Sequence, residues 1–282
     1  SLEIRKRSLP VDHPDLATAY NHIGSVYHNM NQYSKALEYY EKSLEIRKRS
    51  LPVDHPDLAT SYSNIGAVYD RLGEYTKSLE YYHKSLEIRK RSLPVDHPDL
   101  ATAYNHIGSV YHNMNQYSKA LEYYEKSLEI RKRSLPVDHP DLATSYSNIG
   151  AVYDRLGEYT KSLEYYHKSL EIRKRSLPVD HPDLATSYSN IGVVYHNMDE
   201  YSKALEYYHQ SLEIMKRSLP IDHPDLATSY NNIGVAYHNM NQYSKALEYY
   251  EKSLEIMKKT LPSNHWKIKE LKENIELIRS SQ

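Results

Sequence analysis

Hydrophobic residues recur along this chain at steps of three and four, in two stripes separated by a short polar turn. The first stripe consists of Leu16, Tyr20, Ile23, Tyr27 and Met30. The second stripe consists of Tyr33, Ala36, Leu37, Tyr40 and Leu44. Steps of three and four place side chains on one face of an α-helix. The pattern therefore predicts two antiparallel helices joined by a tight turn at Asn31 and Gln32.

Two prolines set the limits of this helical hairpin. Pro10 and Pro14 bracket the segment Val11-Asp12-His13, as expected where one helix has stopped and the next begins. Either Asp12 or His13 is a suitable cap for the first helix, and the sequence does not decide between them. The second helix ends in basic residues, which suit the negative end of a helix dipole.

The whole pattern returns every 42 residues, and the block from Ser1 to Lys84 recurs without change from Ser85 to Lys168. A fixed period of this length predicts a solenoid in which each unit packs on its neighbours. We expect one all-α solenoid of antiparallel helix hairpins, with repeats at about 14–50, 56–92, 98–134, 140–176, 182–218 and 224–260. An extended binding surface then becomes more plausible than a catalytic cleft.

Glycine and tyrosine positions give two packing expectations. Gly24 lies inside the first helix, where glycine costs about 1 kcal/mol relative to alanine. We expect it to allow another backbone to approach, most simply at Ala36 and Ser43. The chain has 30 tyrosines and no phenylalanine, and four of the five tyrosines per repeat fall on the stripes. Tyr39 falls off the second stripe, so exposure is expected for it.

Seven residues of the repeat lie at the spacings of the tetratricopeptide repeat signature, and they are Tyr20, Ile23, Gly24, Tyr27, Ala36, Tyr40 and Ser43. Tyrosine stands where the signature has tryptophan and phenylalanine, and serine stands where it has the last alanine. The run His-Pro-Asp-Leu-Ala-Thr with the following Tyr-Ser-Asn-Ile-Gly resembles the repeats of kinesin light chains. This resemblance implies a right-handed superhelix whose first helices line a concave, peptide-binding surface.

The two ends of the chain differ from the interior. Residues 1–9 match the last part of a second helix, which suggests a fragment of a longer array with an uncapped apolar face. Such a face favours association, so we expect a homodimer through the N-terminal end. Residues 265–280 carry Ile268, Leu271, Ile275 and Ile278 on one stripe with a polar back, which predicts a C-terminal capping helix.

Composition restricts the function. The chain has no cysteine, its formal net charge is -1, and no apolar run is long enough to span a bilayer. We expect no membrane partner and an intracellular, cytoplasmic location. Each basic triplet, such as Arg47-Lys48-Arg49, has acidic residues nearby, so a solvated ridge of paired charges is favoured over a nucleic-acid surface.

Sixteen histidines invite a search for metal or catalytic sites. His22 and His28 are six residues apart, whereas two zinc ligands on one helix favour a spacing of about four. No nucleophile lies in a distinctive turn, and no glycine-rich phosphate loop occurs. We therefore expect no metal, no cofactor and no enzyme activity.

The polar face of the first helices remains as the candidate binding surface, with a peptide segment of another protein as the expected partner. The asparagines expected to contact the peptide are Asn21, Asn64, Asn105, Asn148, Asn190 and Asn232. Asn64, Asn148, Asn190 and Asn232 match the family position that grips peptide backbones, whereas His22 and His106 replace it. The further candidates are His28, His112, His196, His238, Arg71 and Arg155, with the two arginines expected to pair with an acidic residue of the partner.

Two other interpretations remain open at this stage. The identity of the two 84-residue blocks also suits an engineered or recently duplicated array without a selected ligand. Binding of nucleic acid along the basic triplets is the third and least favoured interpretation.

Overall fold

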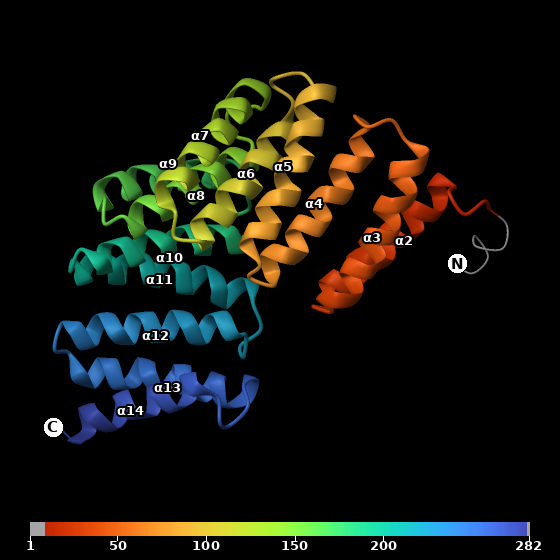
Figure 1. Cartoon of the computed structure of the whole chain (residues 1–282). Helices are drawn as coiled ribbons and strands as arrows, with labels where there is room; N and C mark the ends of the chain where they lie inside the picture. The colour runs from red at the N-terminus through yellow and green to blue at the C-terminus, as the bar shows by residue number, and fades with distance from the viewer. Residues whose placement is uncertain (1–8, 281–282) are drawn as a thin grey trace. The chain divides into compact units, whose positions relative to one another are not determined.

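A computed structural model describes residues 9–280 of the chain. Within this range every regular element is an α-helix, and the helices pair into antiparallel hairpins (Figure 1). The chain divides into two compact units, one ending at Pro136 and the other beginning at Val137. The all-helical array of stacked hairpins predicted from the repeat is confirmed. The partial helix expected at residues 1–9 lies, except for Leu9, outside the described residues.

Each unit contains three hairpins, and the second unit contains one additional helix. The helices of the first unit are α2 (Pro14–Asn29), α3 (Tyr33–Ser50), α4 (Pro56–Arg71), α5 (Tyr75–Ser92), α6 (Pro98–Asn113) and α7 (Tyr117–Ser134). Those of the second are α8 (Pro140–Arg155), α9 (Tyr159–Ser176), α10 (Pro182–Asn197), α11 (Tyr201–Ser218), α12 (Pro224–Asn239), α13 (Tyr243–Thr260) and α14 (Trp266–Ser280). Within a unit, the second helix of one hairpin packs against the first helix of the next.

A histidine caps the first helix of every hairpin. The Asp15 backbone N–H donates to His13 Nδ1 at 3.1 Å, and Pro14 occupies the first turn. The cap satisfies one of the four N–H groups that have no partner within the helix. His13 is therefore the cap, and Asp12 instead pairs with Arg49 at 3.3 Å.

The turn inside each hairpin requires a left-handed residue. Asn31 has a φ of 57° and Gly73 a φ of 73°, a region that glycine and asparagine tolerate best. The Tyr33 hydroxyl also donates to Asn31 Oδ1 at 2.8 Å. This residue choice ends the first helix and starts the second within a few residues.

The repeated helical glycine accommodates a tyrosine ring in every repeat, and the expected close backbone is found beside it at Gly192, where a Cβ would lie 3.3 Å from the Ala204 carbonyl oxygen. A Cβ placed on Gly24 would lie 2.7 Å from Cδ1 of Tyr40. The ring needs this space because the Tyr40 hydroxyl reaches across to Ser25 Oγ at 3.1 Å. Ser43 has a separate role, since its buried hydroxyl donates to the Ala17 carbonyl at 2.7 Å.

The tyrosines divide into a buried position and a half-buried cluster. Tyr40 is buried, whereas Tyr20, Tyr27 and Tyr33 are only partly buried. Tyr39 is not exposed as expected, because its ring stacks on Tyr27 with centroids 5.4 Å apart. One tyrosine per hairpin is therefore fully buried, while Tyr20, Tyr27 and Tyr33 pack against the core and are partly buried.

Helix α14 covers the last hairpin. Its four stripe residues, Ile268, Leu271, Ile275 and Ile278, are buried against α13 together with neighbouring apolar side chains. Leu277, on its other side, is exposed. The predicted stripe of the capping helix is confirmed.

Candidate first-helix binding face

The first helices of neighbouring hairpins lie side by side and form what we call the first-helix face. In the first unit this face is made by α2, α4 and α6, and in the second unit by α8, α10 and α12. In the first unit, Asn64 Nδ2 of α4 donates to Asn21 Oδ1 of α2 at 2.8 Å. Two of the predicted peptide-binding asparagines are thus joined to each other.

A second set of polar pairs follows the same register. Asn113 Nδ2 donates to Asp70 Oδ1 at 3.1 Å in the first unit, and Asn197 Nδ2 donates to Asp154 Oδ1 at 3.0 Å in the second. In the second unit, Asn239 Nδ2 and His196 Nε2 are 3.4 Å apart. Every pair joins residues 43 positions apart, so a residue on one first helix meets the residue one repeat and one position further on.

All six predicted asparagines lie in first helices and are partly buried. Asn190 and Asn232 make no hydrogen bond within residues 9–280, so their amides remain available to a ligand. An amide offers two donors and an accepting oxygen, which suits contact with a peptide backbone.

The four predicted histidines lie at the ends of the first helices, against tyrosines that start the second helices. The ring centroids of His28 and Tyr33 are 5.8 Å apart, and those of His196 and Tyr201 are 5.2 Å apart. His112 and His238 make the same contact with their own tyrosines. Burial lowers the pKa of His28, and Arg71 lowers it further, so this imidazole is neutral near pH 7.

Comparison with known proteins identifies the fold and the family. A model of the tetratricopeptide repeat matches residues 54–133, 141–217 and 183–259, and a second model of this repeat matches residues 16–57. The chain belongs to the tetratricopeptide repeat family. Comparison with curated proteins by sequence found no match.

Solved structures resemble this tetratricopeptide repeat protein in fold. BtubC (BKLC) from P. vanneervenii has a TM-score of 0.71 at 20% identity, covering 83% of this chain and 95% of its own. A kinesin-light-chain-like protein with nearly identical repeats, from Podosopora anserina, has a TM-score of 0.64 at 22% identity, covering 74% and 99%. The Cut9–Hcn1 assembly of the APC/C has a TM-score of 0.66 at 17% identity, covering 98% and 45%. Proteins with tetratricopeptide repeats are generally non-catalytic scaffolds for protein interactions.

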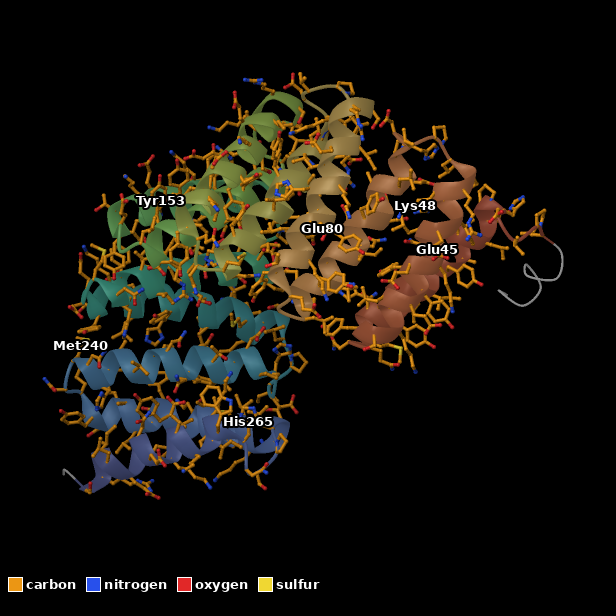
Figure 2. The ribbon with its side chains drawn as sticks, in the orientation of Figure 1. Glu45, Lys48, Glu80, Tyr153, Met240 and His265 are labelled. Atoms are coloured by element: carbon orange, nitrogen blue, oxygen red, sulfur yellow. The ribbon has the colours of Figure 1, made fainter. Side chains whose placement is uncertain are left out.

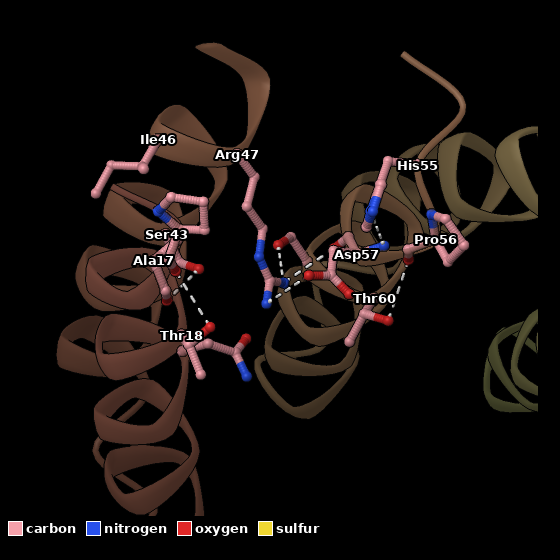
Figure 3. A network of polar contacts seen from close by, with 12 residues as sticks. Ala17, Thr18, Ser43, Ile46, Arg47, His55, Pro56, Asp57 and Thr60 are labelled. Atoms are coloured by element: carbon pink, nitrogen blue, oxygen red, sulfur yellow. Dashed lines mark hydrogen bonds and ion pairs between the residues drawn. The ribbon is translucent and has the colours of Figure 1, made fainter. Parts of the chain in front are cut away.

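Within residues 9–280, the first arginine of each basic triplet lies inside the repeat stack, which the sequence did not predict. Arg47 is 6% exposed, and its Nη1 donates to Ser61 Oγ at 2.8 Å and to the Asp57 carbonyl at 2.9 Å (Figure 3). Arg173 makes the same contact with Ser187, whereas the buried Arg89 donates to Ser63 of the preceding first helix and to Ser85 of its own helix. One sequence signal was available, because Met215 and Met257 occupy this position in the last two repeats.

The arginine at the third position of the triplets is paired with an aspartate. Arg49 pairs with Asp12, and Arg91 Nε lies 2.9 Å from Asp54 Oδ1. The arginine at the first position also lies near an aspartate, since Arg47 Nη2 is 3.6 Å from Asp57 Oδ2. The expected pairing of charges is confirmed for these arginines, but the arginine at the first position is buried and not solvated.

The remaining predicted cations are at the ends of first helices. Arg71 ends α4 and Arg155 ends α8, and both side chains are exposed. Neither arginine forms an ion pair with any residue in the range 9–280. They are the predicted positive charges that a partner would find unneutralised on this face.

An apolar groove on the edge of the first unit was missed by the sequence analysis. It encloses 590 Å³ and includes Val53, Leu58, Tyr62 and Ile88, with Lys48 of α3 and Glu80 of α5 among its polar lining (Figure 2). The available signal was the aliphatic residue that recurs in the loop before each first helix, which is valine in five repeats and Ile221 in the last. Val53 is 75% exposed.

Within residues 9–280, no three histidine or carboxylate side chains converge as metal ligands would. No helix in this part of the chain has the length and apolar character needed to span a membrane.

Proposed function

We propose that the protein is an interaction scaffold that binds an extended or helical peptide of a partner across the first-helix face. The observation that carries the proposal is the set of partly buried, uncharged amides on the first helices, of which Asn190 and Asn232 have no hydrogen bond within residues 9–280. These side chains are held by their own helices, so little conformational entropy is lost when they bind a peptide backbone. Because an amide both donates and accepts, this face can bind peptides of varied sequence.

Arg71 and Arg155 add charge selection to this proposal. Both lack a carboxylate partner in the described part of the chain. We infer that each of these arginines pairs with an acidic residue of the bound peptide. Charge pairing of this kind contributes more to specificity and association rate than to affinity.

A peptide-display selection tests the function. We expect the purified chain to enrich a shared motif, and the double variant Asn190→Ala/Asn232→Ala to lose it. The matched control is Asn264→Ala, which removes an exposed amide from the loop before α14. Equal enrichment by wild type and the double variant would refute the assignment to this face. Absence of any enriched motif from the folded chain would favour a duplicated array without a selected ligand.

A homodimer through the first hairpin is a second proposal. Val26 is 57% exposed on α2, whereas its equivalents Val68 and Val110 on α4 and α6 are fully buried. Burying such an aliphatic side chain contributes about 1.5–3 kcal/mol. Light scattering should show a dimer at micromolar concentration, and Val26→Asp should convert it to a monomer. A wild-type monomer throughout that range would contradict the proposal.

A further inference from the structure

We propose that His28 and Arg71 form a binding site for a side-chain carboxylate, and that His28 takes up a proton when the carboxylate binds. This inference rests on the proposed peptide-binding function of the first-helix face. It adds the chemistry of one ligand group and a dependence on pH.

The register between α2 and α4 places His28 opposite Arg71. Asn21 of α2 is hydrogen-bonded to Asn64 of α4, which fixes how the two helices are aligned. His28 and Arg71 each lie seven residues further along, which is about two helical turns on both helices. The same offset is seen between α4 and α6, where Asp70 meets Asn113.

Arg71 has an unneutralised charge on this face, and its neighbour Asp70 does not supply the missing anion. Successive residues on a helix point about 100° apart. Asp70 therefore points to α6, where Asn113 holds its carboxylate, while Arg71 points to α2. Arg49 and Arg91, by contrast, each have an aspartate within the same repeat.

The Tyr82 hydroxyl is not part of this site. In the first hairpin the equivalent Tyr40 hydroxyl donates to Ser25, but α4 has Ala67 at the serine position. The Tyr82 ring lies against α6 instead, with its centroid 5.1 Å from that of His106. Burial and Asp70 raise the pKa of Tyr82, and Arg71 opposes this effect.

The uptake of a proton by His28 follows from the charges around its ring. The groups facing its ring are Arg71 from α4 and Tyr33 from α3. Without a ligand, burial and Arg71 keep the pKa of His28 below its ordinary value. A carboxylate between the two side chains neutralises the Arg71 charge and accepts a hydrogen bond from the ring, which favours imidazolium. The proton comes from solvent, so the affinity must rise as the pH falls between the pKa values of the bound and free protein.

The first experiment uses a fluorescein-labelled hexaglutamate peptide that is blocked at both ends. Fluorescence anisotropy at low salt should show about fivefold tighter binding at pH 5.5 than at pH 7.5. Uptake of one proton can raise the affinity by at most about tenfold per pH unit. The peptide itself stays largely ionised at both pH values, because glutamate has a pKa of about 4.3. Blocked hexaglutamine should bind at least tenfold more weakly at both pH values.

Two variants and two matched controls locate the site. Arg71→Gln should weaken hexaglutamate binding about tenfold, and His28→Gln should remove the dependence on pH. Arg217→Gln removes another exposed arginine that has no ion pair in the described range, and His22→Gln removes an exposed histidine of the same helix. Both controls should behave as wild type. NMR titration should show that the peptide raises the pKa of His28.

The outcomes separate this inference from the function it rests on. Equal binding of hexaglutamate and hexaglutamine, or a pH dependence that survives His28→Gln, overturns the carboxylate site. A display selection that enriches neutral peptides would leave the proposed function standing in that case. If hexaglutamine with an unblocked C-terminus binds as tightly as blocked hexaglutamate, the site takes a terminal carboxylate, and the assignment to a side chain is wrong.

Discussion

Arg47 is buried at the contact between two hairpins, where the cost of desolvating its charge is offset by polar contacts. Burial lowers the pKa of Arg47, which reflects the cost of removing its charge from water. Its compensation comes from Ser61, from a carbonyl and from the half-exposed Asp57, whose Oδ2 lies 3.6 Å away. Well-packed apolar replacements for buried charges are often neutral or stabilising. The last repeats contain such a replacement in Met215 and Met257.

Arg47→Met is therefore expected to leave stability unchanged or raise it by about 1 kcal/mol. Ser61 is expected to donate to the methionine sulfur, as Ser229 does to Met215 Sδ at 3.1 Å. Arg47→Ala, which leaves a cavity, should cost about 2–4 kcal/mol. Urea denaturation followed by circular dichroism measures both variants. Equal losses in the two variants would mean that the charge itself is stabilising.

The glycine beside the core tyrosine offers a comparison between two kinds of repeat. A Cβ on Gly108 would lie 2.8 Å from the Tyr124 ring, whereas a Cβ on Gly66 would lie 3.1 Å from the Tyr82 ring. Gly108→Ala should cost about 2 kcal/mol through overpacking, even though alanine favours the helix. Gly66→Ala should cost distinctly less, because Tyr82 is not tied to a serine. Thermal denaturation of the two variants measures both losses of stability. Equal losses in Gly108→Ala and Gly66→Ala would contradict this explanation.

At the scale of the element, α6 contains a histidine that resists protonation. The His106 ring lies 5.1 Å from the Tyr82 ring, and its Nδ1 is buried without a hydrogen-bond partner. Burial, with smaller effects of Arg89 and Arg131, lowers the pKa of His106 to about 4. An unfolded histidine has a pKa of about 6.5.

Stability should therefore fall as the pH drops from about 6.5 to about 4, because only the unfolded chain gains the proton in that interval. The difference in pKa corresponds to a loss of up to about 3 kcal/mol. His106→Asn, which introduces the residue found at position 64, should flatten this dependence in urea titrations at pH 7.5 and 5. His22→Asn, at the exposed equivalent position of α2, is the control and should change little. A slope that persists in His106→Asn would assign the effect to other groups.

At the scale of the whole molecule, stability in a repeat array is a sum of local terms. Ile275 is 4% exposed on α14 and packs in the core of the last hairpin, while Leu277 is 62% exposed. Ile275→Glu buries a charge and should detach α14, with amide exchange accelerated in α13. Helices α2 and α3 should keep their protection, because each hairpin depends on its neighbours alone. Leu277→Glu should leave the exchange pattern unchanged, and loss of protection along the entire chain would contradict the local description.

The sequence was sufficient for the helices and insufficient for the polar pairs between them. Pro14, the apolar stripes and the turn residues act locally, so their effects could be predicted from spacing. The burial of Arg47 and the Asn21–Asn64 hydrogen bond depend on how two helices are aligned, which side-chain spacing within one helix does not determine. Tyr39 shows the same limit, because its stacking partner belongs to the other helix of the hairpin.

The polar pairs also determine how such a gene can change length. A first helix ending in Asp70-Arg71 presents its carboxylate to the following helix and its guanidinium to the preceding one. Adding or removing a block of 84 residues preserves every neighbour relation, so the face becomes longer or shorter with unchanged chemistry. Adding or removing a single repeat of 42 residues could instead make two helices that end in Asp-Arg neighbours. The aspartate of the first would then lie opposite the arginine of the second, and the positive charge of the face would be neutralised there. Recombination in units of two repeats therefore changes the length of the first-helix face and keeps the side chains that would contact a ligand.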